Sequence, residues 1–476
     1  MTQQRITAAI PHAVWFLIGG LVVLGAIGPN FLLSLFGAIV LLAGVHLLWR
    51  PGESPIFLWV FAYQWLQASI KTLQANTAGL NLSALANYGG DIETASYLSL
   101  LGLLLLAIGM HWGAGRQFAG PSQAAGELAR RHSMVKWFKL YVLAFGVSSL
   151  ALVAARQVPA LAQPLLALAG FKWAFFFMLT YAAFVRPFSE RRLWLLAFVL
   201  EFLLGFGGYF SGFTKVLFFS LMGVFAAGVR FKPGKVFALT VLGTMCLAFG
   251  ILWTAVKVEY RSFVSGGEVA QIVSVDYAAS LAKLGGLVAN LDQQKLGAAT
   301  EQFVSRITYV DFFGSTVEHV PNVVPHTYGA IWLDAISRPF TPRLLFPSKS
   351  EIHDSDRTNK YSGVLVAGAD QGTSISIGYM GESYIDFGAV LMMLPILGLG
   401  WFFGRIYRWL VTTGPSRGLL GMGLASAALF TAALLESSIT KVFGGLMAAL
   451  LVAWLLNRFI FPRYLSWLMA APIQSR

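Results

Sequence analysis

The sequence predicts an all-α polytopic membrane protein, and three observations lead to this fold class. Hydrophobic residues make up 57% of the 476 residues, charged residues make up 12%, and the mean hydropathy is +0.68. A soluble domain carries roughly 25% charged residues, so an ordinary soluble protein is excluded. The apolar residues also form many separate runs of about 20 residues, the length at which a helix crosses a bilayer. Finally, every second loop between these runs is basic, and the other loops are weakly charged or acidic.

Twelve apolar runs are predicted as transmembrane helices. They cover residues 12–28, 31–49, 55–70, 95–112, 137–155, 164–185, 193–210, 216–229, 236–256, 389–404, 419–435 and 442–460. The first run resembles a signal peptide. It lacks a small-residue cleavage site and is followed at once by further runs, so it is predicted as the first span.

The charge distribution predicts the orientation of these spans. The chain carries a net charge of +13, but residues 258–382 contain nine Lys/Arg and thirteen Asp/Glu, so this part carries −4 and the remainder +17. Every second loop is basic, which places both termini in the cytoplasm and the acidic segment outside. No basic face interleaved with aromatic residues suggests a nucleic-acid partner.

The predicted organisation has three parts. Residues 1–257 form a bundle of spans one to nine, residues 258–384 form an outer segment, and residues 385–476 form spans ten to twelve. Apolar residues at helical spacing over 268–302 predict one or two amphipathic helices in the outer segment, and its second half, rich in Pro and Gly, predicts ordered loop. The single cysteine, Cys246, excludes an intrachain disulfide and a cysteine metal cluster. With no P-loop, nucleotide fold or zinc motif, neither a cofactor nor a metal is expected.

Charged residues inside spans are costly and are therefore candidates for function. Glu201 lies in the middle of a predicted span, and Lys172 and Lys215 lie near the outer ends of theirs. Two interpretations remain open: a structural ion pair with snorkelling lysines, or outer cations that receive an anionic head group. Glu436 and Lys441, which flank the last outer turn, are predicted to form a structural pair.

The outer segment contains cations that suit phosphate. Arginine binds phosphate through a planar fork of N–H groups, so several arginines at a membrane surface suit a diphosphate. Each of these cations taken alone is typical of a solvated surface. All of them, however, are predicted to lie outside the cytoplasm, where the positive-inside rule disfavours Lys and Arg. The set is Arg261, Arg306, Arg338, Arg343 and Lys349.

Candidate bases follow in the same segment. Glu382 and Asp386, in GESYIDFG, lie four residues apart and would share one face of a helix. Partial desolvation would suit one of them to general-base catalysis, whereas a cap and membrane-interface anchor beside Tyr384 is an equally weighted alternative. His353 is a further candidate. Asp354-Ser355-Asp356 spells the DxD pattern, but its hydrophilic neighbours favour a solvated turn.

Several motifs resemble one known family. The run PRLLFPSK, the later Asn359, and TSISIGYMGESYIDFG followed directly by a span resemble the bacterial Wzy-type O-antigen and exopolysaccharide repeat-unit polymerases. VPHTYGAIW and the turn YFSGFTK are also similar to that family. The resemblance covers residues 209–388 and the overall span pattern. Where the family often has Ser-Arg or Ser-Lys after the glycine, this chain departs from the pattern and has Gly-Phe-Thr-Lys at residues 212–215.

The resemblance implies a GT-C-like glycosyltransferase of the bacterial inner membrane that works at the periplasmic face without a metal. Its donor would be a growing glycan on undecaprenyl diphosphate, and its acceptor a single repeat unit on the same membrane lipid. A flippase and a chain-length regulator are the implied protein partners. We expect Glu382 to take the acceptor proton, with Asp386 or His353 in reserve. Cations expected to hold the diphosphate are Arg261, Arg306, Arg343 and Lys215, with Arg338, Lys349, Lys172 and Tyr384 as further substrate contacts.

Two alternatives remain. An O-antigen ligase would share the chemistry and differ in its acceptor. A lipid-linked oligosaccharide flippase or polysaccharide transporter belongs to a different class. It is disfavoured because the long segment follows span nine, and because the two halves of the chain show no sequence similarity to each other.

Overall fold

The computed structural model describes residues 12–116, 119–205, 213–228, 233–266, 274–342, 345–346, 348–349, 353–368, 373–414 and 416–463. Over these residues the regular structure consists of helices and contains no strand, which confirms the predicted all-α class. The α-helices are α1 (His12–Ile27), α2 (Phe31–Leu48), α3 (Ile56–Thr77), α4 (Ile92–Ala114), α5 (Ala119–Arg131), α6 (Met134–Gln157), α7 (Ala162–Gly170), α8 (Lys172–Phe184), α9 (Arg192–Leu204), α10 (Phe213–Ala226), α11 (Pro233–Val264), α12 (Tyr277–Ala289), α13 (Gln293–Ile307), α14 (Val310–His319), α15 (Ala330–Ser337), α16 (Asp354–Ser362), α17 (Tyr379–Leu391), α18 (Met393–Thr412), α19 (Leu419–Leu429) and α20 (Ile439–Leu455).

Several of these helices could cross a membrane. Five described helical segments are long and apolar enough, and the bent pair α17–α18 would make a sixth. The five are Phe31–Leu48, Ile92–Ala114, Met134–Gln157, Pro159–Phe184 and Ile439–Arg463. Each of the twelve predicted spans overlaps a helix, but some of these helices, such as the 13-residue α9 and the 11-residue α19, are short. The predicted helix positions are therefore confirmed, while the number of crossings stays a prediction.

Polar side chains set the starts of several helices. Asp91 accepts a hydrogen bond from the amide of Thr94 at 2.9 Å and caps α4. Asp276 and Asp292 cap α12 and α13 in the same way, through amides three residues further on. Such a carboxylate satisfies an amide that lacks a partner inside the helix and lies at the positive end of the helix dipole.

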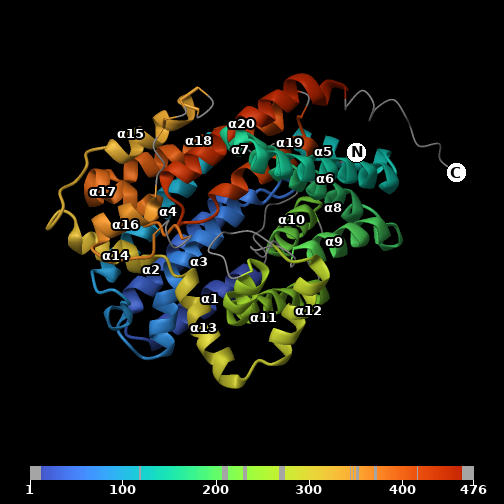
Figure 1. The fold of residues 1–476 in the computed structure, drawn as a ribbon. Coiled ribbons are helices and arrows are strands. Elements are labelled where there is room, and N and C mark those ends of the chain that lie inside the picture. Colours follow the sequence, from blue (N-terminus) through green and yellow to red (C-terminus); the bar gives the residue numbers. More distant parts are fainter. Residues whose placement is uncertain are drawn as a thin grey trace.

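The centre of the bundle is the close pair α4 and α18. Gly109 and Gly113 on α4 face Gly400 and Gly404 on α18, and each pair is separated by three residues. A Cβ atom added to Gly109 would lie 2.3 Å from the carbonyl oxygen of Leu397, so the two backbones touch directly. Glycines at this spacing are typical of membrane helices that pack without intervening side chains. Around this pair lie α2, α3, α14 and α19 (Figure 1).

The outer segment is joined to the bundle more closely than predicted. The boundaries at 257/258 and 384/385 both fall inside helices, α11 and α17, because the chain has no helix-breaking residue there. The predicted amphipathic helices are present as α12 and α13. The region predicted as ordered loop also contains α14, α15 and α16, so that prediction was wrong in part.

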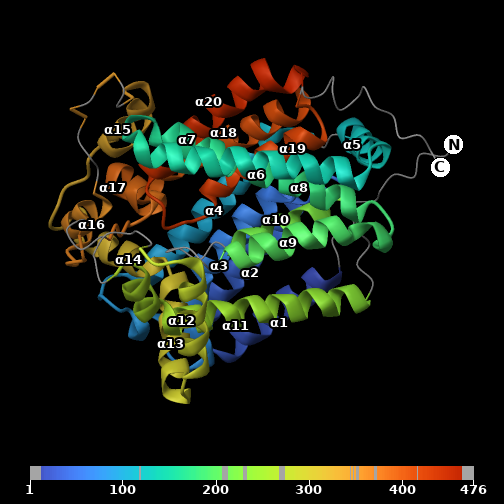
Figure 2. The same ribbon diagram turned by 45° about the vertical axis from the view of Figure 1, so that its right-hand side comes forward.

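The helices of the outer segment form two groups. In both views α11, α12 and α13 lie together, and α14, α15, α16 and α17 form a second group (Figures 1 and 2). The second group reaches the common core, where Val310 and Phe313 of α14 are fully buried. It is this group that carries the acidic motif GESYIDFG.

Candidate functional site

Helix α17 carries the acidic motif and is bent sharply away from α18. The two helices make an angle of 119°, and the bend lies at Gly388, whose φ of 70° is in the left-handed region open to glycine. Glu382 and Asp386 are one turn apart in α17, as predicted. Both are fully buried, however, with 1% and 0% of their surface exposed, and not at an open lip of the bundle.

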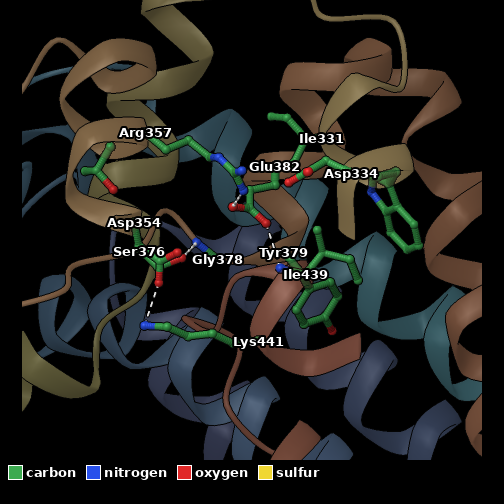
Figure 3. Close-up of polar contacts among 12 residues, drawn as sticks. Ile331, Asp334, Asp354, Arg357, Ser376, Gly378, Tyr379, Glu382, Ile439 and Lys441 are labelled. Carbon is green, nitrogen blue, oxygen red and sulfur yellow. Dashed lines mark hydrogen bonds and ion pairs between the residues drawn. The ribbon is translucent and has the colours of Figure 1, made fainter. Parts of the chain in front are cut away.

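Glu382 joins three helices. Its Oε1 accepts a hydrogen bond from Arg357 Nη1 of α16 at 2.5 Å, and its Oε2 accepts one from the amide of Ile439 at the start of α20 at 2.7 Å (Figure 3). A buried carboxylate is stabilised only by such partners, because burial removes its hydration. Both oxygens of Glu382 are thus engaged within the protein.

Arg357 faces several carboxylates. Its side chain is 15% exposed. Burial lowers the pKa of the guanidinium, but the negative charges of Glu382, Asp354 and Asp334 more than offset this, and the pKa lies above its usual value. Arg357 therefore stays charged, and it is the cation that these three carboxylates surround.

Asp334 of α15 links Arg357 to Arg338, a cation that was predicted from the sequence as a substrate contact. Its carboxylate lies beside Arg357 and Glu382 in Figure 3, and its Oδ2 accepts a hydrogen bond from Arg338 Nε at 2.8 Å. Lys349 Nζ donates to the carbonyl oxygens of Arg338 and Thr341. The structure thus brings Arg338, Lys349 and Glu382 into one region.

Asp354 is the buried half of the DxD pattern. It begins α16, is 2% exposed, and its Oδ2 lies 2.6 Å from Lys441 Nζ of α20. Asp356 is exposed. The solvated-turn interpretation was therefore wrong for Asp354, because the helix turns that residue inwards. Lys441 pairs with a residue far away in sequence, whereas its predicted partner Glu436 accepts a hydrogen bond from Gln67.

We call the group formed by Arg357, Glu382, Asp334, Asp354 and Lys441 the charged cluster. It links α15, α16, α17 and α20. Among the described residues, no group of three or more His, Cys, Asp or Glu side chains is arranged to hold a metal ion.

Asp386 anchors α15 on α17. Its carboxylate accepts hydrogen bonds from the amides of Ile331 at 3.1 Å and Trp332 at 2.9 Å, and from the hydroxyl of Thr327. The amide of Thr327 also donates to the carbonyl oxygen of Ile385. The two motifs VPHTYGAIW and GESYIDFG therefore bind each other, and Asp386 has the capping role that the sequence left open. Tyr384 has a structural role as well, since its hydroxyl donates to the carbonyl oxygen of Val320 at 3.0 Å.

Replacing Asp386 by alanine is expected to loosen α15. The change leaves two buried amides and a hydroxyl without an acceptor, which costs about 2–3 kcal/mol in the free energy of unfolding. Hydrogen exchange should show faster exchange of the amides of Ile331 and Trp332, with little change in α4. The exposed Asp356→Ala is the matched control. Unchanged protection of those two amides in the Asp386 variant would contradict the capping role.

A polar stripe on α3 continues from the charged cluster. Gln64, Gln67, Lys71 and Gln74 follow one another at spacings of three and four, so they share one face of the helix. Gln64 Oε1 accepts a hydrogen bond from the hydroxyl of Tyr379, one turn from Glu382. Gln67 Oε1 accepts one from the amide of Leu435. Lys71 is paired with the buried carboxylate of Asp311.

The remaining predicted site residues lie elsewhere or are not described. Lys172 Nζ lies 2.8 Å from Glu201 Oε2, and Glu201 Oε1 accepts a hydrogen bond from the hydroxyl of Tyr141. This arrangement supports the ion-pair interpretation.

Lys215 lies in the first turn of α10, which packs on α8. Arg261 lies on α11, which packs on α12 and α13, and His353 is exposed at the start of α16. Arg343 and the side chain of Arg306 lie outside the described residues.

Two features of the site were missed from the sequence. Arg357 stands in the hydrophilic stretch DSDRTNK, which has no apolar pattern that would have predicted burial. The stripe on α3 did leave a signal, namely four polar residues at helical spacing. The predicted span ended at residue 70, whereas α3 continues to Thr77, so Lys71 was assigned to a loop.

Comparison with known proteins gives one match. A family model described as "Domain of unknown function (DUF8712)" matches residues 101–436, which include Asp334, Arg357, Glu382 and Asp386. No curated protein and no solved structure matches the chain. Because the matched region covers more than half of the 476 residues, the chain belongs to the DUF8712 family.

Proposed function

We propose that this protein is a GT-C-like glycosyltransferase that polymerises lipid-linked oligosaccharide repeat units at the periplasmic face of a bacterial inner membrane. The observation that carries the proposal is Arg357, a half-buried cation that pairs with the buried carboxylate of Glu382. Its setting is the region where the motifs similar to repeat-unit polymerases meet. The donor glycan and the acceptor unit are both attached to undecaprenyl diphosphate.

Together with Arg338 and Lys349, which lie in the same region, the charged cluster has four cations and three carboxylates, and this net positive charge suits the departure of a diphosphate. The hydroxyl oxygen of the acceptor sugar forms a bond to the anomeric carbon of the donor, and the bond from that carbon to the lipid diphosphate breaks. The diphosphate keeps the electron pair, so negative charge develops on its oxygens. Arg357 has five N–H groups, and within the described residues one of its nitrogens has an acceptor, Glu382. The others can bind the leaving group in the bidentate manner typical of arginine.

Glu382 fits an orienting role better than the proposed role of base. Both its oxygens are engaged, and its side chain is 1% exposed. Of the carboxylates around Arg357, Asp334 has the most accessible side chain, at 40%, against 2% for Asp354. We therefore assign the acceptor proton to Asp334, and to Glu382 the positioning of Arg357.

The proposal includes the membrane arrangement predicted from the sequence. Twelve crossings with both termini in the cytoplasm place residues 258–384 in the periplasm. A flippase would deliver the repeat units, and a chain-length regulator would act on the product.

Deletion of the gene, followed by gel analysis of surface glycan, tests the proposal. A polymerase predicts surface glycan limited to a single repeat unit, restored to a ladder by the wild-type gene and not by Asp334→Asn. Unmodified lipid A together with long undecaprenyl-linked chains would instead indicate a ligase. Repeat units retained on the cytoplasmic side would indicate a flippase. An unchanged ladder in the deletion strain would refute the polymerase proposal.

A further inference from the structure

A second polar site lies at the far end of the stripe on α3. A cavity of about 410 Å³ opens between α3, the loop around the short helix at Leu82–Leu85, and the C-terminal half of α13. Its volume is in the range of small-molecule sites. Helix α13 packs on α3 at this point (Figures 1 and 2). None of the cavity residues belongs to the charged cluster.

The floor of the cavity is a fixed polar network. Lys71 and Asp311 are 3% and 5% exposed and form an ion pair. Asp311 also accepts hydrogen bonds from the amide and the Nδ2 atom of Asn87, both at 3.1 Å. The ammonium group of Lys71 carries three protons, and among the described residues one acceptor, Asp311, is present. The cation thus retains donor capacity while its position is set.

The lining fits a neutral ligand with many hydroxyl groups. Three amide side chains and two hydroxyls offer both donors and acceptors, and a carboxylate adds acceptors. They are Gln74, Asn87, Gln302, Ser305, Thr308 and Glu301.

The charge of the described lining disfavours a phosphate group. Asp311 balances Lys71, and Glu301 then leaves the described residues of the cavity with a net negative charge. A lipid tail is also a poor fit, because Leu85 and Ala298 are the apolar residues among those described. The chemistry that remains is that of a sugar ring.

The stripe connects this cavity to the charged cluster. Gln64 contacts Tyr379 beside Glu382, and Gln74 lines the cavity. At a rise of 1.5 Å per residue these two glutamines are about 15 Å apart along α3. The side chains of Gln64 and Gln67 are buried, so an oligosaccharide that reaches both sites spans this distance over the surface above the stripe.

We propose that this cavity is a carbohydrate subsite that holds a sugar of the acceptor repeat unit while its reacting end lies at Arg357. This inference rests on the proposed function and adds to it the place where the substrate's sugars are recognised. Lys71, Asn87 and Gln302 supply the hydrogen bonds.

Direct binding tests the subsite. The probe is the single repeat-unit oligosaccharide released from the host's own surface glycan, observed by saturation-transfer NMR on the full-length protein in nanodiscs. The double variant Gln302→Ala/Ser305→Ala removes two exposed side chains of α13, and Gln294→Ala, exposed on the same helix outside the lining, is the matched control. We expect the double variant to bind at least about tenfold more weakly and the control to bind like wild type. Equal affinity in all three proteins, or no binding to wild type, would overturn the inference.

A steady-state assay separates this result from the proposed function. In a polymerisation assay with lipid-linked units, the double variant should raise the acceptor KM about tenfold and leave kcat unchanged, as expected for a binding site away from the reacting atoms. Polymerisation with an unchanged KM would refute the subsite and leave the polymerase proposal standing. Conversely, variant-sensitive oligosaccharide binding in a protein whose deletion leaves the glycan ladder intact would support the subsite and refute the polymerase.

Discussion

Arg357→Ala is expected to abolish polymer formation, with a loss of at least about 10²–10³-fold in kcat. The reason is that, in the proposed reaction, the variant removes the charge-assisted donors for the leaving diphosphate. It also leaves the carboxylate of Glu382 buried without its cation, which costs about 3–5 kcal/mol in the free energy of unfolding. Polymer length in a reconstituted assay and the thermal midpoint in detergent measure the two effects.

A second variant separates catalysis from folding. Arg357→Met/Glu382→Gln removes both charges, so the stability loss should be largely recovered while activity stays absent. Arg357→Lys keeps the charge but lacks the planar fork, and it should retain stability better than activity. Lys360→Ala, an exposed cation on the same helix, is the control. Full activity in the stable double variant would show that Arg357 has no role in the reaction.

Gly400→Val is expected to separate α18 from α4 and to destabilise the bundle. A Cβ atom at Gly400 would lie 2.2 Å from the carbonyl oxygen of Leu106, and a backbone atom cannot move aside as a side-chain end can. Overpacking of this kind costs at least about 2–3 kcal/mol. Gly109→Val, on the facing helix, should act in the same way. Yield of monodisperse protein in detergent and its thermal midpoint measure the effect.

The same helix provides the control. Gly398 lies on α18, and a Cβ atom there would meet nothing within 4 Å. Gly398→Ala should therefore leave the midpoint unchanged or raise it slightly, because alanine favours a helix more than glycine does. If Gly398→Ala and Gly400→Val lowered the midpoint equally, the direct contact of the two backbones would not be the cause.

Local pattern was sufficient to predict the apolar helices of this protein, whereas the shorter helices α5, α14, α15 and α16 lie in regions predicted as loops. Each predicted span overlaps a helix, because an apolar run of membrane length has few other ways to satisfy its backbone. The amphipathic spacing over residues 268–302 likewise predicted α12 and α13. The ends of the helices were predicted less accurately. Helix α3 continues past its predicted end through Lys71, and α11 continues to Val264, because a charged residue does not end a helix whose neighbours shield it.

The two carboxylates of GESYIDFG were predicted as site residues, whereas Arg357 and Asp334 were not, and the roles of all four depend on distant partners. Glu382 and Asp386 share a face of one helix, as their spacing of four indicates. The first meets Arg357 and the second meets the start of α15. Nothing in GESYIDFG distinguishes the two carboxylates, because their partners lie 25 and about 55 residues away.

The sequence by itself determined the all-α class, the positions of the apolar helices and two of the carboxylates at the site, Glu382 and Asp386. Only the tertiary structure decided which charges face each other: Arg357 with Glu382, Lys441 with Asp354 and Lys71 with Asp311. The physical reason is that apolar periodicity acts along a single helix and is visible in local sequence. A buried charge, by contrast, is stabilised by whichever opposite charge the packing of separate helices brings within hydrogen-bond distance.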